Sequence, residues 1–314
     1  MDPNLLYWKS QGQSFLSRVR IWFNLLDPSL LLCSDAQIQG ARSLIGGGED
    51  SEKDAAAQTL ALSSVHADSG AVLPLVFRPP ALMPVAAPLV VASFLPHSSV
   101  KPALIWQLLL QSYNAGFNYA NRNSSSEQQS KTASLKQLLL IAGTVSYATC
   151  AGALPQIFIN RLGVRSAPVQ TFFRSILPIP LSAALAFFSV STIRIEETET
   201  GIQVFDSHGS PVGISKAAGE KAVRETALSR AALFGTTAAV PNLLIFLLNR
   251  TRLFQRNSLL VAPLRHISIA LILGLMIPVS FSLFPQLGTI KKETLEEELQ
   301  AAAADGHLFY HRGL

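Results

Sequence analysis

The stretch Leu110–Asn123 reads LQSYNAGFNYANRN, and it closes a segment that opens with ALIWQLLL at residues 103–110. Five amide side chains recur through the segment at spacings of four, three, four and three residues, namely Gln107, Gln111, Asn114, Asn118 and Asn121. On an α-helix this spacing places the side chains along one face. The segment therefore predicts a helix that is apolar over most of its circumference and carries one polar stripe, the amide stripe.

The composition places this helix in a lipid bilayer. Of the 314 residues, 49% are apolar and only 14% are charged, whereas a soluble domain carries roughly 25% charged residues. The net charge is +5, but the basic residues do not gather with aromatic residues in a patch, so no nucleic-acid partner is expected. The two cysteines, Cys33 and Cys150, are too far apart in the chain to suggest a disulfide framework or a zinc site.

Five segments are long and apolar enough to cross a membrane, and they are residues 103–120, 138–159, 171–193, 231–249 and 266–287. Each approaches the roughly 20 residues that a bilayer core requires. A sixth segment, Ala81–Leu95, contains two prolines and would span only ~22 Å, so it is interpreted as interfacial or re-entrant. The expected fold class is an all-α membrane protein with five transmembrane helices and an amphipathic, helical N-terminal domain.

The charges of the connecting segments predict an orientation. The 160–170 and 250–265 loops contain arginine and no acid, whereas the 194–230 segment and the tail contain groups of glutamates. By the positive-inside rule, the two arginine loops face the negatively charged compartment. Because five is an odd number of spans, the N-terminal region (1–100) is expected on that same side. The acidic tail (288–314) is expected on the other side of the transmembrane domain (101–287).

The N-terminal region contains an amphipathic pattern. One helical face is shared by five apolar side chains: Phe15, Val19, Trp22, Phe23 and Leu26. Arg18 and Arg20 lie off this face. A basic amphipathic helix of this kind lies on a membrane surface or addresses a mitochondrion. The alternative is a helix packed on the rest of the N-terminal domain, and the pattern does not separate these interpretations.

The amide stripe cannot face lipid. An unpaired amide in hydrocarbon costs roughly 2–7 kcal/mol, whereas each leucine in the helix returns only about 0.3–0.6 kcal/mol on insertion. The stripe must therefore face protein, water or a ligand. Hydrogen bonds between neighbouring helices are one interpretation. The other is a path for a polar, zwitterionic cargo, since uncharged donors and acceptors would bind it without a strong ion pair.

The same residues resemble a known family. NAGFNYANRN at 114–123 is similar to the asparagine-rich signature of the sideroflexins, which are mitochondrial inner-membrane proteins. HADSG at 66–70 resembles the family's HPDTGE motif, KAVRETALSR at 221–230 resembles the segment before its fourth span, and LFPQ at 283–286 resembles the end of its fifth. The resemblance covers nearly the whole chain. It implies five spans, an N-terminus in the matrix, a C-terminus in the intermembrane space and transport of amino acids.

The HADSG motif departs from the family pattern in part. Asp68 and Gly70 match it, whereas the family's Pro, Thr and Glu are replaced, which weighs against serine as the cargo. His66 and Asp68 either contribute to a substrate site or form a turn or helix cap, for which Asp-Ser-Gly is well suited.

Two functions are consistent with these observations. The first is a carrier for a small neutral amino acid, which uses the amide stripe and a polar entrance formed by Thr226, Ser229 and Arg230. Arg230 would either meet a carboxylate or extend to the membrane interface. The second is a non-transporting factor for assembly of respiratory complex I and for iron–sulfur supply, which rests on the family resemblance alone. The sequence offers no metal-ligand cluster, cofactor motif or nucleophile–base pair, so no metal, cofactor or enzymatic activity is expected.

Overall fold

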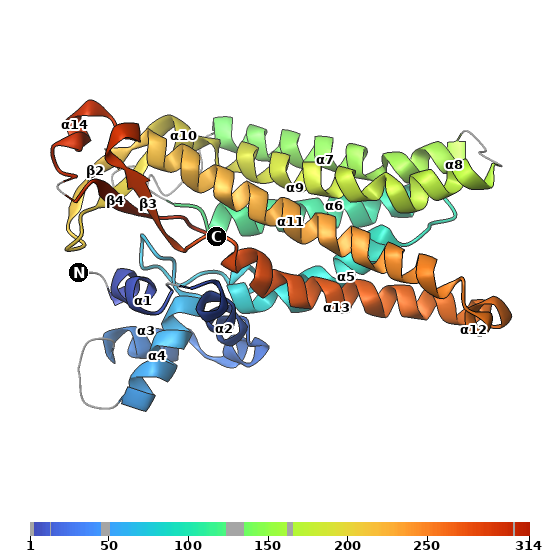
Figure 1. Cartoon of the computed structure of the whole chain (residues 1–314), viewed down its shortest axis with the longest axis horizontal. Coiled ribbons are helices and arrows are strands. Elements are labelled where there is room, and N and C mark those ends of the chain that lie inside the picture. The colour runs from blue at the N-terminus through green and yellow to red at the C-terminus, as the bar shows by residue number, and fades with distance from the viewer. Residues whose placement is uncertain (1–2, 13, 45–50, 124–134, 162–165, 304) are drawn as a thin grey trace.

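Long helices form the body of the protein and run along its longest axis (Figure 1). The computed structural model describes residues 3–12, 14–44, 51–123, 135–161, 166–303 and 305–314. The long helices are α6 (Val100–Ala120), α7 (Leu135–Arg161), α9 (Pro178–Ile193), α11 (Lys216–Leu248) and α13 (Val261–Ser282). The helix α9 continues from α8 (Ala167–Thr171) through a π-helical turn at Phe172–Ile176.

Four helices are long and apolar enough to cross a membrane: Leu135–Arg161, Pro168–Ile193, Lys216–Leu248 and Val261–Ser282. They correspond to the second to fifth expected spans. The first expected span forms α6, whose 21 residues give a rise of about 31 Å. It is not among the four because its amides reduce its apolar character.

The proline-containing segment that was expected to be interfacial or re-entrant forms a short helix inside the bundle. It consists of a 3₁₀ turn, Pro79–Ala81, and α5 (Leu82–Phe94), which packs against α6 and α13. The helix α5 begins near the N-terminal helices and ends at the opposite end of the bundle, where α6 begins (Figure 1). The chain therefore passes along the bundle once more than the sequence predicted.

This additional pass brings the N-terminal region and the C-terminal segment to the same end of the bundle. The N-terminal helices are α1 (Pro3–Gln11), α2 (Phe15–Leu25), α3 (Asp35–Leu44) and α4 (Ser51–Ser64). Lys9 Nζ donates to the carbonyl oxygen of Ser207, at 2.6 Å, and Arg18 Nε donates to that of Ser282, at 2.9 Å. The two regions that were expected on opposite sides of the membrane therefore lie at the same end of the bundle.

The all-α expectation is wrong at this end of the bundle, where four strands form an antiparallel sheet in the order β2-β1-β4-β3. The strands are β1 (Ile202–Phe205), β2 (Pro211–Ser215), β3 (Leu287–Lys291) and β4 (His307–His311). Leu308 and Tyr310 of β4 are fully buried and pack with Val204 and Ala222. The segment that was expected to be an acidic tail is thus folded. Short helices α10 (Ile195–Thr200), α12 (Arg252–Arg256) and α14 (Glu297–Gln300) complete the structure.

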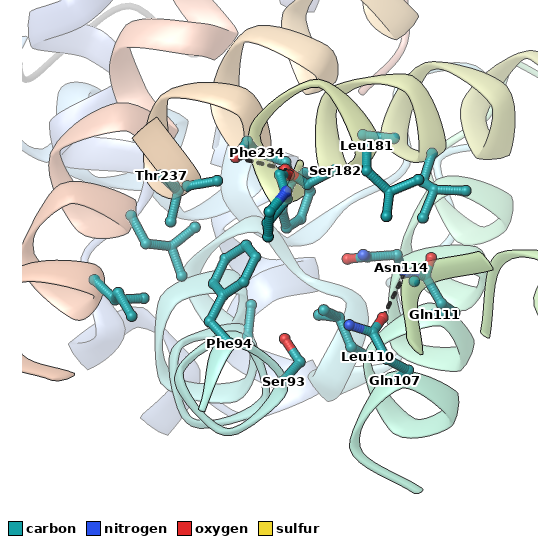
Figure 2. A pocket seen from close by; sticks show the side chains of 18 of the residues that line it. Ser93, Phe94, Gln107, Leu110, Gln111, Asn114, Leu181, Ser182, Phe234 and Thr237 are labelled. Atoms are coloured by element: carbon teal, nitrogen blue, oxygen red, sulfur yellow. Dashed lines mark hydrogen bonds between the residues drawn. The ribbon is translucent and has the colours of Figure 1, made fainter. Parts of the chain in front are cut away.

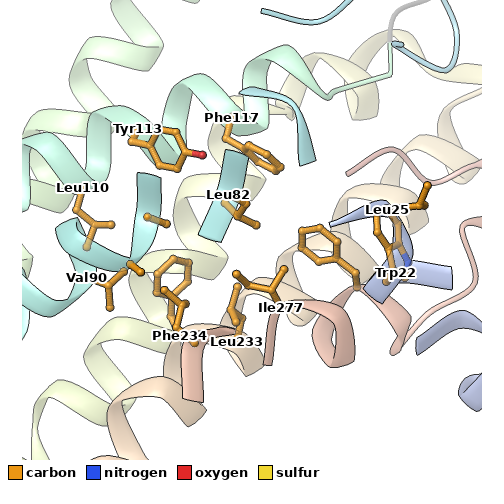
Figure 3. Close-up of a cluster of buried hydrophobic side chains, with 14 of the residues drawn as sticks. Trp22, Leu25, Leu82, Val90, Leu110, Tyr113, Phe117, Leu233, Phe234 and Ile277 are labelled. Atoms are coloured by element: carbon orange, nitrogen blue, oxygen red, sulfur yellow. The ribbon is translucent and has the colours of Figure 1, made fainter. Parts of the chain in front are cut away.

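A hydrophobic core joins the N-terminal helices to the bundle. Figure 3 shows Trp22 and Leu25 of α2 beside the side chains of α5, α6, α11 and α13. The ring of Trp22 meets Phe281 edge-on, with 4.9 Å between the ring centroids. Along the outside of the bundle, leucine and phenylalanine side chains are exposed, as a lipid-facing surface requires.

Candidate functional site

A cavity of about 130 Å³ lies inside the bundle. Figure 2 shows its walls, with Ser93 and Phe94 from α5, Gln107, Gln111 and Asn114 from α6, Ser182 from α9, and Phe234 and Thr237 from α11. Every long helix contributes at least one lining residue. The combination of apolar walls with a few converging polar groups is typical of a small-molecule site.

Four of the five amides of the stripe line this cavity: Gln107, Gln111, Asn114 and Asn118. Gln111 Nε2 donates to Gln107 Oε1 at 3.3 Å. Gln107 also lies against Gly152 of α7, where a Cβ atom would stand 2.5 Å from its Oε1. The Oδ1 atom of Asn118 is buried and has no hydrogen-bond partner. The stripe therefore faces a cavity and leaves an acceptor unoccupied there.

Asn121, the fifth amide, does not line the cavity and has a structural role. Its Nδ2 donates to the carbonyl oxygens of Phe77 and Phe117, each at 2.9 Å. The backbone carbonyl oxygen of Asn121 accepts a hydrogen bond from the backbone N–H of Leu314 at 3.1 Å. Asn121 therefore ties the end of α6 to the N-terminal region and to the C-terminal segment, and it does not lie on the cavity wall with the other four amides.

Arg230 on α11 is a buried cation at the cavity wall. It is 5% exposed, so it does not extend to the interface. Its Cζ lies 4.1 Å from the ring centroid of Phe281 and 5.8 Å from that of Phe117, within the range of cation–π attraction. Its Nη2 has no hydrogen-bond partner, and no carboxylate of the described residues forms a salt bridge with it.

Arg194 and Arg312 lie close enough to Arg230 to repel its charge. Arg194 has Glu197 as its partner. Burial, and to a smaller extent Arg194, lower the pKa of Arg312 to about 10, while nearby Glu225 favours its charged form. Arg312 therefore stays protonated at neutral pH. Arg194 and Arg312 therefore each have a carboxylate nearby, whereas the described residues supply none for Arg230.

A family model described as Sideroflexins matches residues 4–314. The chain belongs to the sideroflexin family. Sideroflexin-4 of Danio rerio is 54% identical over 318 residues, which cover 100% of both chains. Human Sideroflexin-4 is 35% identical, with 100% of this chain and 93% of the human protein covered. Human Sideroflexin-5 is 29% identical over 312 residues, with 97% and 91% covered. No solved structure matches the chain. The resemblance in the sequence is thus confirmed.

The polar residues before Arg230 do not form an entrance in this sideroflexin. Thr226 and Ser229 are each 1% exposed, and neither lines the cavity. Ser229 Oγ donates to the carbonyl oxygen of Thr226 at 2.8 Å within α11, and Thr226 Oγ1 has no partner. Of the three residues predicted there, only Arg230 reaches the cavity.

The HADSG motif of this sideroflexin forms a turn away from the cavity. The backbone N–H groups of Asp68 and Ser69 donate to His66 Nδ1, at 3.3 and 3.2 Å. His66 Nε2 therefore carries the proton and donates to the carbonyl oxygen of Arg122 at 2.7 Å. Gly70 adopts a left-handed conformation, with φ of 66°, and its N–H donates to the His66 carbonyl. The motif thus joins the N-terminal region to the end of α6, which agrees with the turn interpretation.

Two parts of the cavity wall were not anticipated. Ser93 and Phe94 come from α5, which was expected to be interfacial or re-entrant and was not assigned to a site. Phe173 and Arg174 come from the π-helical turn before α9, and such turns are frequent at functional sites. The sequence feature that could have drawn attention to these two stretches is their proline content, since Pro84 and Pro178 lie near them. Among the described residues, no group of three or more His, Cys, Asp or Glu could hold a metal ion.

Proposed function

We propose that this sideroflexin carries a small neutral amino acid across the mitochondrial inner membrane and binds it in the cavity between its helices. The observation that carries this proposal is the buried guanidinium of Arg230, which has a free Nη2 and forms no salt bridge with a carboxylate of the described residues. Burial of an unpaired charge costs several kcal/mol. An anionic group in the cavity would remove that cost.

The carboxylate of an amino acid would supply this anionic group. Its ammonium would in turn find Asn118 Oδ1, an acceptor without a partner in the same cavity. A cavity of roughly 150 Å³ holds a benzene-sized molecule, so the observed volume of about 130 Å³ suits a cargo of similarly small size. The donor at Arg230 and the acceptor at Asn118 thus match the two ends of a zwitterion.

The proposed topology follows from the helices that surround the cavity. α6 serves as the fifth span, because its amides turn inward and leave Ile105, Leu108 and Leu109 exposed for lipid contact. Arginines of the α7–α8 and α11–α13 connections favour the matrix for that end of the bundle. The N-terminal helices and the sheet would then share the intermembrane space.

Uptake of labelled neutral amino acids into proteoliposomes tests the carrier proposal. Arg230→Gln should lower uptake by about tenfold or more, since interactions with buried charges are worth roughly 2–5 kcal/mol. Arg256→Gln, which alters an exposed arginine at the opposite end of the bundle, is the matched control and should transport normally. Uptake by Arg230→Gln at the wild-type rate would refute the proposed binding role of Arg230.

The alternative proposal is a non-transporting factor for complex I assembly and iron homeostasis. It rests on the family resemblance, and Arg230→Gln also separates it from the carrier. If a variant that is inactive in liposomes restores complex I in cells lacking the protein, assembly does not depend on transport. If complex I and uptake are lost together, assembly depends on the cavity.

A further inference from the structure

The N-terminal helix α2 has three faces with different surroundings. The first face, Arg18, Ile21, Trp22 and Leu25, is buried against the bundle. The second is apolar but exposed, with Phe15 at 42%, Leu16 at 77% and Phe23 at 52% exposure. The third is polar and contains Ser17, Arg20 and Asn24. A helix that only packs on its own protein would need the first and third faces, so the second face requires an explanation.

The position of α2 indicates what covers this face. The helix lies across the bundle axis at the end of α13 (Figure 1). Arg18 Nε donates to the carbonyl oxygen of Ser282, the last residue of α13, and Trp22 meets Phe281 edge-on. The helix is therefore fixed at the level where α13 ends.

The helix α2 packs against α13, whose exposed side is apolar as well. The helix α13 is one of the four candidate spans, and its exposed side is a row of apolar side chains: Ile267, Leu271, Leu275 and, just beyond its end, Leu283. The turn after α2 adds Leu32, which is 88% exposed. Apolar side chains at the end of a span, next to an arginine on the polar face, match the boundary between acyl chains and headgroups.

We infer that α2 is an in-plane membrane anchor, with Phe15, Leu16 and Phe23 inserted among the acyl chains and Arg20 and Asn24 among the headgroups. Its inner face remains bound to the bundle through Trp22. The anchor would hold the N-terminal region at the membrane surface without adding a span. This inference does not depend on which molecule the cavity binds.

Spin labels on single cysteines test the anchor in the full-length protein. Cys33 and Cys150 are first replaced by serine, and labels are placed through Leu16→Cys, Phe23→Cys and, as the matched control on the polar face, Asn24→Cys. The protein is reconstituted in vesicles of phosphatidylcholine and an anionic phospholipid. Collisions with oxygen report on lipid, and collisions with a water-soluble nickel chelate report on water.

The expected result is that positions 16 and 23 are at least several times more accessible to oxygen than to the nickel chelate, with the opposite order at position 24. Equal accessibility of positions 23 and 24 to the chelate would overturn the inference and place the apolar face in water. Low accessibility of positions 16 and 23 to both reagents would also overturn it, because a protein partner would then cover the face.

Discussion

Arg194 and Glu197 form an ion pair that is almost completely removed from solvent, with side chains 0% and 3% exposed. The Nη2–Oε2 distance is 2.7 Å, and Arg194 Nη2 also donates to the carbonyl oxygen of Arg312 at 2.8 Å. Asn123 Nδ2 donates to Glu197 Oε2 at 3.0 Å. The pair thus joins the start of α10 to the end of α6 and to the C-terminal segment.

We expect Arg194→Met to destabilise the protein strongly, because it leaves Glu197 buried without its partner. Loss of one member of a buried pair costs about 3–5 kcal/mol, and thermal unfolding in detergent should show a large decrease in Tm. Lys136→Met is the control, since it breaks the exposed Lys136–Glu199 pair, whose loss costs at most about 1 kcal/mol. Equal decreases in the two variants would show that burial of the pair is not what matters.

Asn118→Leu and Asn121→Leu should have opposite effects. Asn118 Oδ1 has no hydrogen-bond partner among the described residues, so Leu should abolish uptake while Tm stays close to wild type. Asn121 Nδ2 donates two hydrogen bonds, so Leu there should lower stability by about 1–3 kcal/mol. Uptake assays and thermal unfolding of both purified variants check this prediction. Normal uptake by Asn118→Leu at normal abundance would exclude that amide from the cargo site.

Two glycines of α7 offer a matched pair. Gly152→Ala would place a Cβ atom 2.5 Å from Gln107 Oε1 and push that side chain into the cavity, whereas a Cβ atom at Gly143 meets nothing within 4 Å. We expect Gly152→Ala to raise the KM of uptake several-fold. Gly143→Ala should leave uptake unchanged and stabilise the helix by about 0.5–1 kcal/mol. If the two variants have the same KM, the position of Gln107 does not affect binding.

Cysteine labelling tests the arrangement of the chain ends. Gln11 and Glu297 are exposed at the end of the bundle that carries the sheet, and Arg252 is exposed at the other end. In a background without native cysteines, an impermeant maleimide added to mitoplasts should label Gln11→Cys and Glu297→Cys from the same side. Arg252→Cys should react only after the membrane is permeabilised. Labelling of Gln11→Cys together with Arg252→Cys would contradict the extra pass through α5.

The long elements of this fold could be predicted from sequence because their signals repeat. The amide stripe recurs over four turns of α6, so its inward face was evident, and the later spans were marked by apolar length. The segment of α5 was recognised as apolar but interpreted as interfacial or re-entrant, because it is short and contains Pro84 and Pro88. The sheet was missed because its strands have only four or five residues, too few for a period to stand out.

The candidate site was predicted less completely, because its properties depend on tertiary contacts. Asn121 follows the same spacing as Asn118, yet it lies at the helix end, where free carbonyl groups attract its amide. Thr226 and Ser229 precede Arg230 in one motif, but they point away from the cavity that Arg230 lines. Only the positions of its neighbours in the structure show that Arg230 has no salt-bridge partner among the described residues.

The return of the chain through α5 makes the two faces of the membrane unequal. In the described part of the protein, the N-terminal helices, the sheet, α10 and α14 all emerge at one end of the bundle. Among the described residues, the other end exposes little more than the connections at residues 95–99 and 249–260. Macromolecules in one compartment would therefore meet a large folded surface. Those in the other would meet mainly short connections and their exposed arginines, Arg250, Arg252 and Arg256, so a large partner would find a folded surface to bind on one side of the bilayer.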